Sequence, residues 1–229
     1  MIGYYNYTVI LTYVSLLSSA IGIFLCAIGE PVAAVFCLMA SGFCDMFDGK
    51  IAGTKKDRTD AERHFGIQID SLSDIVCFCV LPACIGSALI AHHTQNWTDY
   101  WWYMLLAPLL ILCGLIRLAY FNVTEEVRKK SESGRRKYYY GLPVTASAVI
   151  VPFTFCFERL FRPDGASVGA GLYTNGFRIF YAAFLLATAI TYITPLRLRK
   201  PYKAGIALLS LLGGAELTVL LMNFVCGIF

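Results

Sequence analysis

Two pairs of aspartates are the residues of this chain whose types and spacing could do chemistry. Asp45 and Asp48 lie three positions apart, and Asp70 and Asp74 lie four positions apart in the stretch D-S-L-S-D. Residues three or four apart share one face of an α-helix, so each pair presents two carboxylates in one direction. Mg²⁺ and Mn²⁺ prefer carboxylate oxygens. Two such ions held close together are a recurring device for phosphoryl chemistry, because they bind both the attacking and the leaving oxygen.

The composition indicates where these acids must sit. The chain has 229 residues, of which 58% are hydrophobic and 15% charged, and its mean hydropathy is +0.63. Soluble domains usually contain about 45–50% apolar and about 25% charged residues. The composition therefore predicts an all-α fold, a polytopic bundle of transmembrane helices. No internal repeat or low-complexity segment divides the chain, so we expect a single domain over residues 1–229.

The apolar runs give the expected spans. A helix needs about 20 predominantly apolar residues to cross a bilayer. About seven runs qualify, namely 8–29, 31–48, 67–91, 101–122, 140–158, 177–195 and 204–228. The first aspartate pair falls at the end of the second run, and the second pair falls near the start of the third.

Lysine and arginine predict the orientation of these spans. They gather in three connecting segments, around 49–66, 123–139 and 197–203. Seven spans place all three segments on one side, which the positive-inside rule makes cytoplasmic. We therefore expect a multi-pass protein of the cell membrane whose N-terminus and active site are cytoplasmic. All four aspartates then lie near one depth, at the cytoplasmic helix ends.

Facing carboxylates at one depth need a cation. They would repel one another strongly in a medium of low dielectric, so intramembrane acids are by default functional. One alternative is that the acids lie in the head-group layer and pair with Lys50 or Arg63. Another is a cation transporter or channel, although transport acids usually lie near the bilayer midplane between broken helices. The matched depth of the two pairs favours a two-metal site.

Other residues are expected at the same depth. Gly49 and Gly66 flank the aspartates, and glycine permits a close approach of the backbone to a ligand. Arg117 lies near the cytoplasmic end of the fourth run. Its side chain either reaches the interface as a long basic residue commonly does, or binds a phosphate with its planar fork.

These residues resemble the signature of the CDP-alcohol phosphatidyltransferase family, D-x-x-D-G-x-x-A-R-x8-G-x-x-x-D-x-x-x-D. The chain reads D-M-F-D-G-K-I-A at 45–52 and G-I-Q-I-D-S-L-S-D at 66–74. Three further stretches resemble the branch of that family that uses serine. They are F-G-I-Q-I-D-S-L-S-D-I-V-C-F at 65–78, R-L-A-Y-F-N at 117–122 and G-L-P at 141–143.

The resemblance implies a fold and a reaction. The family has a six-helix catalytic core and transfers a phosphatidyl group from a CDP-linked lipid to a hydroxyl, releasing CMP. In the serine branch, the donor is CDP-diacylglycerol, the acceptor is L-serine and the product is phosphatidylserine. The resemblance also implies a homodimer in contact with membrane lipid, and we expect no nucleic acid partner.

The resemblance further implies roles for particular residues. Two divalent cations, Mg²⁺ or Mn²⁺, would be bound by the carboxylates of Asp45, Asp48, Asp70 and Asp74. Asp74 would also be the catalytic base that takes the proton of the serine hydroxyl. The CDP-lipid would be bound by Gly49, Ala52 and Gly66. The acceptor or a lipid phosphate would be bound by Arg117 and Lys137.

The chain departs from the signature in one place. Gly53 stands where the signature has arginine, and twelve residues separate it from Gly66, against eight in the signature. The missing positive charge could come from one of four basic residues, Lys55, Lys56, Arg58 or Arg63. The departure also leaves open an inactive relative that serves as a membrane scaffold. A further alternative keeps the chemistry and changes the acceptor to glycerol 3-phosphate, inositol phosphate or choline.

Overall fold

The computed structural model describes residues 3–91, 98, 100–131, 138–157, 174–199 and 203–225. The main helices are α1 (Ile10–Ala27), α2 (Pro31–Ala52), α3 (Asp60–Ile75), α4 (Leu81–Ala91), α5 (Tyr103–Ser131), α6 (Ser147–Cys156), α7 (Asn175–Ile193) and α8 (Lys203–Val225). Short 3-10 turns η1 (Tyr7–Val9) and η4 (Val144–Ala146) precede α1 and α6, and a π-helical turn η2 (Val76–Val80) joins α3 to α4. The predicted all-α polytopic bundle is confirmed.

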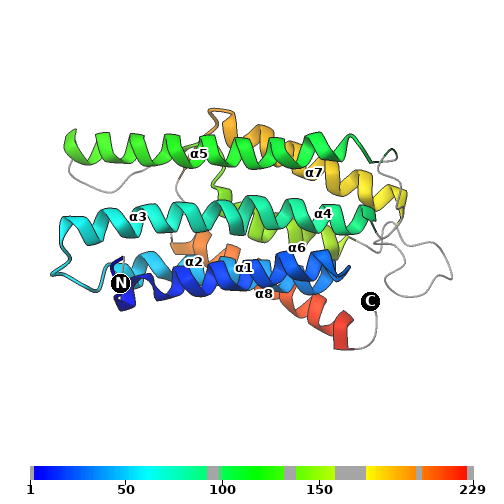
Figure 1. Ribbon diagram of the computed structural model, residues 1–229, viewed down its shortest axis with the longest axis horizontal. Helices are drawn as coiled ribbons and strands as arrows, with labels where there is room; N and C mark the ends of the chain where they lie inside the picture. Colours follow the sequence, from blue (N-terminus) through cyan, green and yellow to red (C-terminus); the bar gives the residue numbers. More distant parts are fainter. Residues whose placement is uncertain are drawn as a thin grey trace.

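The helices run in alternating directions through the bundle, with α3 and α4 counted as one continuous helix (Figure 1). α3, η2 and α4 form one continuous rod, and the N-terminus lies at the same end of the molecule as the connection between α2 and α3. One short ribbon accompanies the helices, in which β1 (Tyr138–Tyr140) pairs antiparallel with β2 (Arg197–Arg199). The alternation brings the end of α2 and the start of α3 together at one end of the bundle.

Within the described residues, five helical segments are long and apolar enough to cross a membrane. They are Tyr7–Ala27, Pro31–Ala52, Asp60–Ala91, Tyr103–Arg128 and Asn175–Ile193. The expected span 140–158 corresponds to a shorter apolar helix, Val144–Cys156, and the expected span 204–228 corresponds to α8, Lys203–Val225. The fifth expected span starts late because Gly141 has a positive φ of +78° and Pro143 is extended. The helices are those of a multi-pass membrane protein.

A stripe of small hydroxyl side chains joins α1 to α2. Thr8, Thr12, Ser15 and Ser19 recur every three or four positions, and all four are buried. The hydroxyls of Ser19 and Ser41 are 2.8 Å apart, and the Ser41 hydroxyl donates to the Ser15 carbonyl at 2.9 Å. Small residues allow membrane helices to approach closely and to hydrogen-bond across their interface. This interface fixes the position of α2, and therefore of the aspartates near its end.

The start of α3 is fixed by a capping box. The Thr59 hydroxyl accepts from the Glu62 backbone N–H at 3.2 Å, and the Glu62 carboxylate accepts from the Thr59 backbone N–H at 2.9 Å. This reciprocal pair satisfies two amides that the helix itself leaves without partners. Lys55 and Asn6 also donate to the Glu62 carboxylate, at 2.8 and 3.1 Å. The connecting loop and the N-terminal segment are thus tied to the first turn of α3.

Candidate metal and nucleotide site

Three of the four predicted metal ligands converge between α2 and α3. Asp45, Asp70 and Asp74 each offer a carboxylate oxygen, and these oxygens all lie within 4.8 Å of one another. Asp45 comes from α2, and the other two come from successive turns of one face of α3. The facing pairs expected from the sequence are therefore brought together by the antiparallel packing of these two helices.

The fourth aspartate, Asp48, lies next to this group. Its side chain is in contact with that of Asp70, and it accepts from the Thr12 hydroxyl at 3.5 Å. Asp48 and Asp70 line an adjoining pocket, whereas Asp74 is only 9% exposed. The carboxylates therefore extend from the pocket wall into the interior of the bundle.

The donor set fits hard divalent cations. None of the ion pairs formed within the described residues involves any of these four carboxylates. The alternative partners are engaged elsewhere, since the Lys50 ammonium lies over the Phe47 ring at 4.9 Å and Arg63 lies 3.9 Å from Asp60. Clustered acids without a basic partner in an apolar bundle call for bound cations, and oxygen-only ligands suit Mg²⁺ or Mn²⁺.

A local distortion follows the last of these aspartates. The π-helical turn η2 begins two residues after Asp74 and interrupts the otherwise regular rod of α3 and α4. Such turns are rare and occur frequently at functional sites. Burial along α3 also begins here, at Ser73, whose hydroxyl donates to the Thr12 carbonyl at 3.4 Å.

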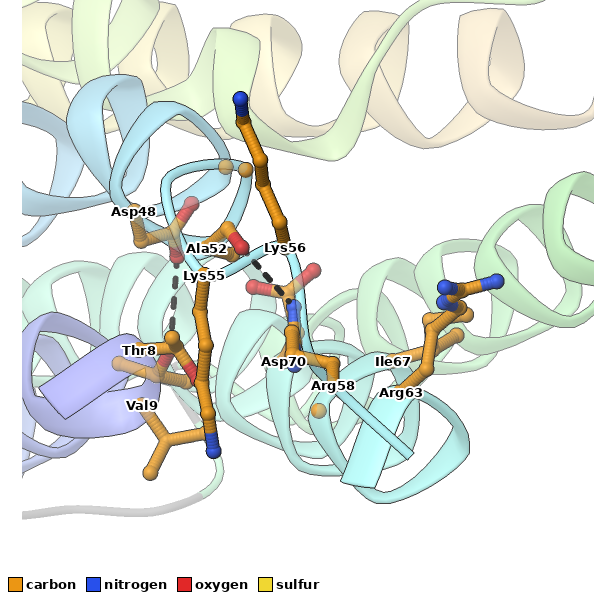
Figure 2. A pocket seen from close by; sticks show the side chains of 14 residues that line it. Thr8, Val9, Asp48, Ala52, Lys55, Lys56, Arg58, Arg63, Ile67 and Asp70 are labelled. Carbon is orange, nitrogen blue, oxygen red and sulfur yellow. Dashed lines mark hydrogen bonds between the residues drawn. The ribbon is translucent and has the colours of Figure 1, made fainter. Parts of the chain in front are cut away.

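A pocket of about 590 Å³ opens beside the carboxylates, at the end of α2 and the start of α3 (Figure 2). Small-molecule sites usually measure about 300–1,000 Å³. The three residues expected to bind the CDP-lipid, Gly49, Ala52 and Gly66, all line it. A Cβ atom added at Gly49 would meet nothing within 4 Å, so the backbone of α2 faces open space there.

The wall of this pocket carries both signs of charge. Asp48 and Asp70 contribute carboxylates, and the loop and first turn of α3 contribute four basic residues, Lys55, Lys56, Arg58 and Arg63. Carboxylates that bind cations next to basic groups that bind phosphate oxygens suit a ligand with a diphosphate. The pKa of Lys55 is raised because its ammonium donates to the Glu62 carboxylate.

The motifs of the serine branch contact one another. Arg117, only 6% exposed, donates from Nε to the Leu142 carbonyl at 3.1 Å and from Nη2 to the Gly141 carbonyl at 3.4 Å. The Asn122 amide donates to the Ser71 hydroxyl at 2.7 Å. R-L-A-Y-F-N thus links D-S-L-S-D to G-L-P. The acceptor role expected for Arg117 stays a prediction, and Lys137 lies outside the described residues.

The N-terminal segment contributes pocket residues that lie outside the motifs. Thr8, Val9 and Thr12 line the pocket, and Thr12 contacts the predicted ligand Asp48. A signal for them exists in the sequence, because hydroxyl residues recur every three or four positions through an otherwise apolar run. Such a stripe predicts a buried polar face, but it does not predict which helix that face meets.

The comparison with known proteins agrees with this arrangement. The profile of the CDP-alcohol phosphatidyltransferase family matches residues 5–193. This range includes both aspartate pairs and all the residues that line the pocket. The chain therefore belongs to the CDP-alcohol phosphatidyltransferase family.

Several curated relatives are similar to parts of the chain. The CDP-diacylglycerol–serine O-phosphatidyltransferase of Saccharomyces cerevisiae is 34% identical over 121 residues, which is 52% of this chain and 40% of the relative. The archaetidylserine synthase of Methanothermobacter thermautotrophicus is 34% identical over 135 residues, 58% of this chain and 51% of the relative. The Mycobacterium tuberculosis CDP-diacylglycerol–serine O-phosphatidyltransferase is 25% identical over 177 residues, which is 77% of this chain and 55% of the relative. The chain thus spans about half the length of the relatives it matches.

Proposed function

We propose that this chain transfers the phosphatidyl group of CDP-diacylglycerol to the hydroxyl of L-serine, giving phosphatidylserine and CMP. The observation that carries the proposal is the convergence of three aspartates, with Asp48 in contact with one of them, beside a pocket that is also lined by four basic residues. The acceptor is assigned from the three contacting motifs and from the names of the relatives, which act on serine or form archaetidylserine.

The pocket would hold the cytidine diphosphate end of the donor. Gly49 and Ala52 lie along its wall, where their small size leaves room for the nucleotide, and Gly66 on the same wall leaves room for the guanidinium of Arg58. The lipid chains of the donor remain in the membrane, whereas serine and CMP exchange with water. A site at the end of α2 and the start of α3 is accessible to both kinds of substrate. We assign it to the cytoplasmic face of the cell membrane because lysine and arginine gather in the segments on that side, 49–66, 123–139 and 197–203.

Asp45, Asp48, Asp70 and Asp74 would hold two divalent cations, Mg²⁺ or Mn²⁺. When bound, such ions neutralise the charge that develops on the diphosphate as the bond to CMP breaks. The serine oxygen forms a new bond to the phosphorus that carries the diacylglycerol, and CMP leaves with the electrons of the broken bond.

Asp74 is assigned as the base that accepts the proton of the serine hydroxyl. A carboxylate beside cations is normally acidic, so it acts as a base only when it is positioned close to the hydroxyl and kept from bulk water. The side chain of Asp74 is 9% exposed and lies deeper than the pocket wall, which supports this role. Arg117 is kept as a candidate for binding the acceptor, and a homodimer is the proposed assembly.

The acceptor is tested by supplying the purified chain with CDP-diacylglycerol, Mn²⁺ and isotope-labelled L-serine. We expect label in a lipid that co-migrates with phosphatidylserine, together with release of one CMP per labelled lipid. Label only from glycerol 3-phosphate, inositol phosphate or choline would keep the mechanism and change the acceptor. Metal flux into liposomes without CMP release from any acceptor would instead indicate a transporter.

A further inference from the structure

Arg58 lies in the loop between α2 and α3, and its side chain turns back toward the end of α2. Its Nη1 donates to the Ala52 carbonyl at 3.3 Å, and its Nη2 donates to the Glu62 carbonyl at 3.3 Å. Its Nε is buried and has no hydrogen-bond partner among the residues that the structure describes. One guanidinium therefore connects the last residue of α2 to the first turn of α3, and these two helices carry the two halves of the signature.

The guanidinium also passes directly over Gly66, the second glycine of the signature. A Cβ atom at Gly66 would lie 2.5 Å from Nη2 of Arg58, closer than real Cβ contacts. Glycine at this position therefore leaves the space that the arginine side chain occupies. Arg58 and the predicted CDP-lipid residues Ala52 and Gly66 form one continuous part of the pocket wall.

The three other basic residues of the pocket are placed differently. Lys55 forms an ion pair with Glu62 at 2.8 Å, and Arg63 lies 3.9 Å from Asp60. In Figure 2 the terminal groups of Lys56 and Arg63 point away from Ala52, whereas a dashed line joins Arg58 to it. Arg58 is held by backbone carbonyls, and no ion pair within the described residues involves it. Its positive charge stays available to an anion.

The position of Arg58 coincides with the departure from the family signature. The signature places arginine directly after the alanine, where this chain has Gly53, and the following segment is four residues longer than in the signature. A longer loop allows an arginine further along the chain to turn back to the end of α2. The hydrogen bond from Arg58 to the Ala52 carbonyl brings its guanidinium to the residue next to the vacant position.

We propose that Arg58 replaces the signature arginine and binds the phosphate groups of the CDP-lipid. The planar guanidinium fork matches phosphate oxygens, and Arg58 lines the pocket together with Asp48 and Asp70. The proposal rests on the proposed function, because it names the residue that recognises the donor of that reaction. It predicts that an arginine introduced at position 53, as in the family signature, can take over the role of Arg58 when Arg58 is removed.

The experiment compares the unaltered chain with Arg58→Ala, Gly53→Arg and the double variant. We expect Arg58→Ala to raise the KM for CDP-diacylglycerol roughly 10- to 100-fold, the loss typical of a hydrogen bond to a charged group, with the KM for L-serine unchanged. Gly53→Arg in the Arg58→Ala background should recover most of that loss. A Cβ at Gly53 meets only ordinary contacts, 3.4 Å from the Lys50 carbonyl, so a side chain can begin there without a clash.

Two controls separate binding from a structural role. Lys130→Ala removes an exposed basic residue that pairs with Glu126 outside the pocket, and it should leave both KM values unchanged. Titration of each variant with CDP and Mn²⁺ measures nucleotide binding without turnover. If Arg58 served only to hold the loop, Arg58→Ala would lower the melting temperature, and Gly53→Arg would not restore CDP binding.

The outcomes distinguish this inference from the proposed function. A chain that releases no CMP with any acceptor, but binds CDP in an Arg58-dependent way, would contradict the reaction and support the inference. An active chain whose Arg58→Ala variant keeps its KM for CDP-diacylglycerol and its CDP affinity within twofold would overturn the inference. Failure of Gly53→Arg to restore either quantity would also overturn it.

Discussion

A carboxylate inside an apolar bundle is costly unless a cation neutralises it. The four aspartates could be predicted to converge because helix periodicity gives each pair one face and the positive-inside rule gives both pairs one depth. The structure brings oxygens of Asp45, Asp70 and Asp74 within 4.8 Å of one another and places Asp48 against Asp70. Their use as metal ligands stays a prediction.

Thr12 offers a test of the residues around that cluster. Thr12→Val keeps the volume of a buried side chain and removes the hydroxyl that donates to Asp48. We expect the apparent affinity for Mn²⁺ to fall about 10- to 100-fold, as for other groups that orient metal ligands. The measurement is CMP release as a function of Mn²⁺ concentration.

Thr154→Val is the matched control for this substitution. Thr154 is equally buried, but its hydroxyl bonds the Val151 carbonyl of its own helix, so the metal dependence should not change. Equal Mn²⁺ dependence in the Thr12 and Thr154 variants would mean that Thr12 does not orient Asp48.

Two site residues could not be assigned from the sequence for physical reasons. Thr12 lies in an apolar run, and its contact with Asp48 depends on the packing of α1 against α2, which no local pattern specifies. Arg58 was one of four basic residues in a short loop, and charge alone does not distinguish them. What selects Arg58 is the hydrogen bonds it makes to two backbone carbonyls.

At the scale of elements, the ends of the helices position the site. The capping box of Thr59 and Glu62, which was not among the predictions, fixes the start of α3. The π-helical turn η2 could not be predicted, because the sequence V-C-F-C-V fits an ordinary apolar helix equally well. The late start of α6 follows from the positive φ of Gly141. The G-L-P motif marks this position, but its spacing does not predict the backbone conformation.

Substitution of Gly141 tests this turn. Its φ of +78° disfavours a side chain, and a Cβ atom would lie 2.8 Å from the Tyr192 carbonyl and 3.2 Å from Nε of Arg117. We expect Gly141→Ala to destabilise the protein by at least about 1–2 kcal/mol, the usual cost of the left-handed conformation. A thermal melt in detergent measures the change.

Gly213→Ala provides the comparison for that melt. A Cβ atom at Gly213 meets nothing within 4 Å inside α8, and alanine is favoured over glycine within a helix by roughly 0.5–1 kcal/mol. Its melting temperature should therefore be unchanged or higher. An unchanged melting temperature for Gly141→Ala would show that the turn tolerates a side chain.

The whole molecule is an alternating bundle whose charge distribution gives its expected orientation. The class of fold was predictable because an apolar composition with regular basic loops leaves few arrangements open. The length of the fifth span was less predictable, since the helix Val144–Cys156 is shorter than the apolar run 140–158 that contains it. Hydropathy measures how apolar a stretch is, but it does not detect turns within that stretch. The turn at Gly141 and Pro143 makes the helix shorter than the apolar run.

Cysteine labelling tests the orientation of the protein in the membrane. Lys130, at the end of α5, lies on the side with the basic loops, and Thr98, before α5, lies on the other side. In intact cells, we expect an impermeant maleimide to label Thr98→Cys directly and Lys130→Cys only after permeabilisation, above the background of the parent chain. The reverse pattern would place the pocket on the outer face.

The most direct test of the central claim is CMP release from CDP-diacylglycerol by the purified chain, measured with L-serine and Mn²⁺, after chelation of the metal, and for Asp74→Asn. The account predicts serine-dependent release that both chelation and the substitution abolish, while the variant keeps the unaltered chain's melting temperature. Undiminished release by Asp74→Asn, or release that persists without divalent cations, would contradict it.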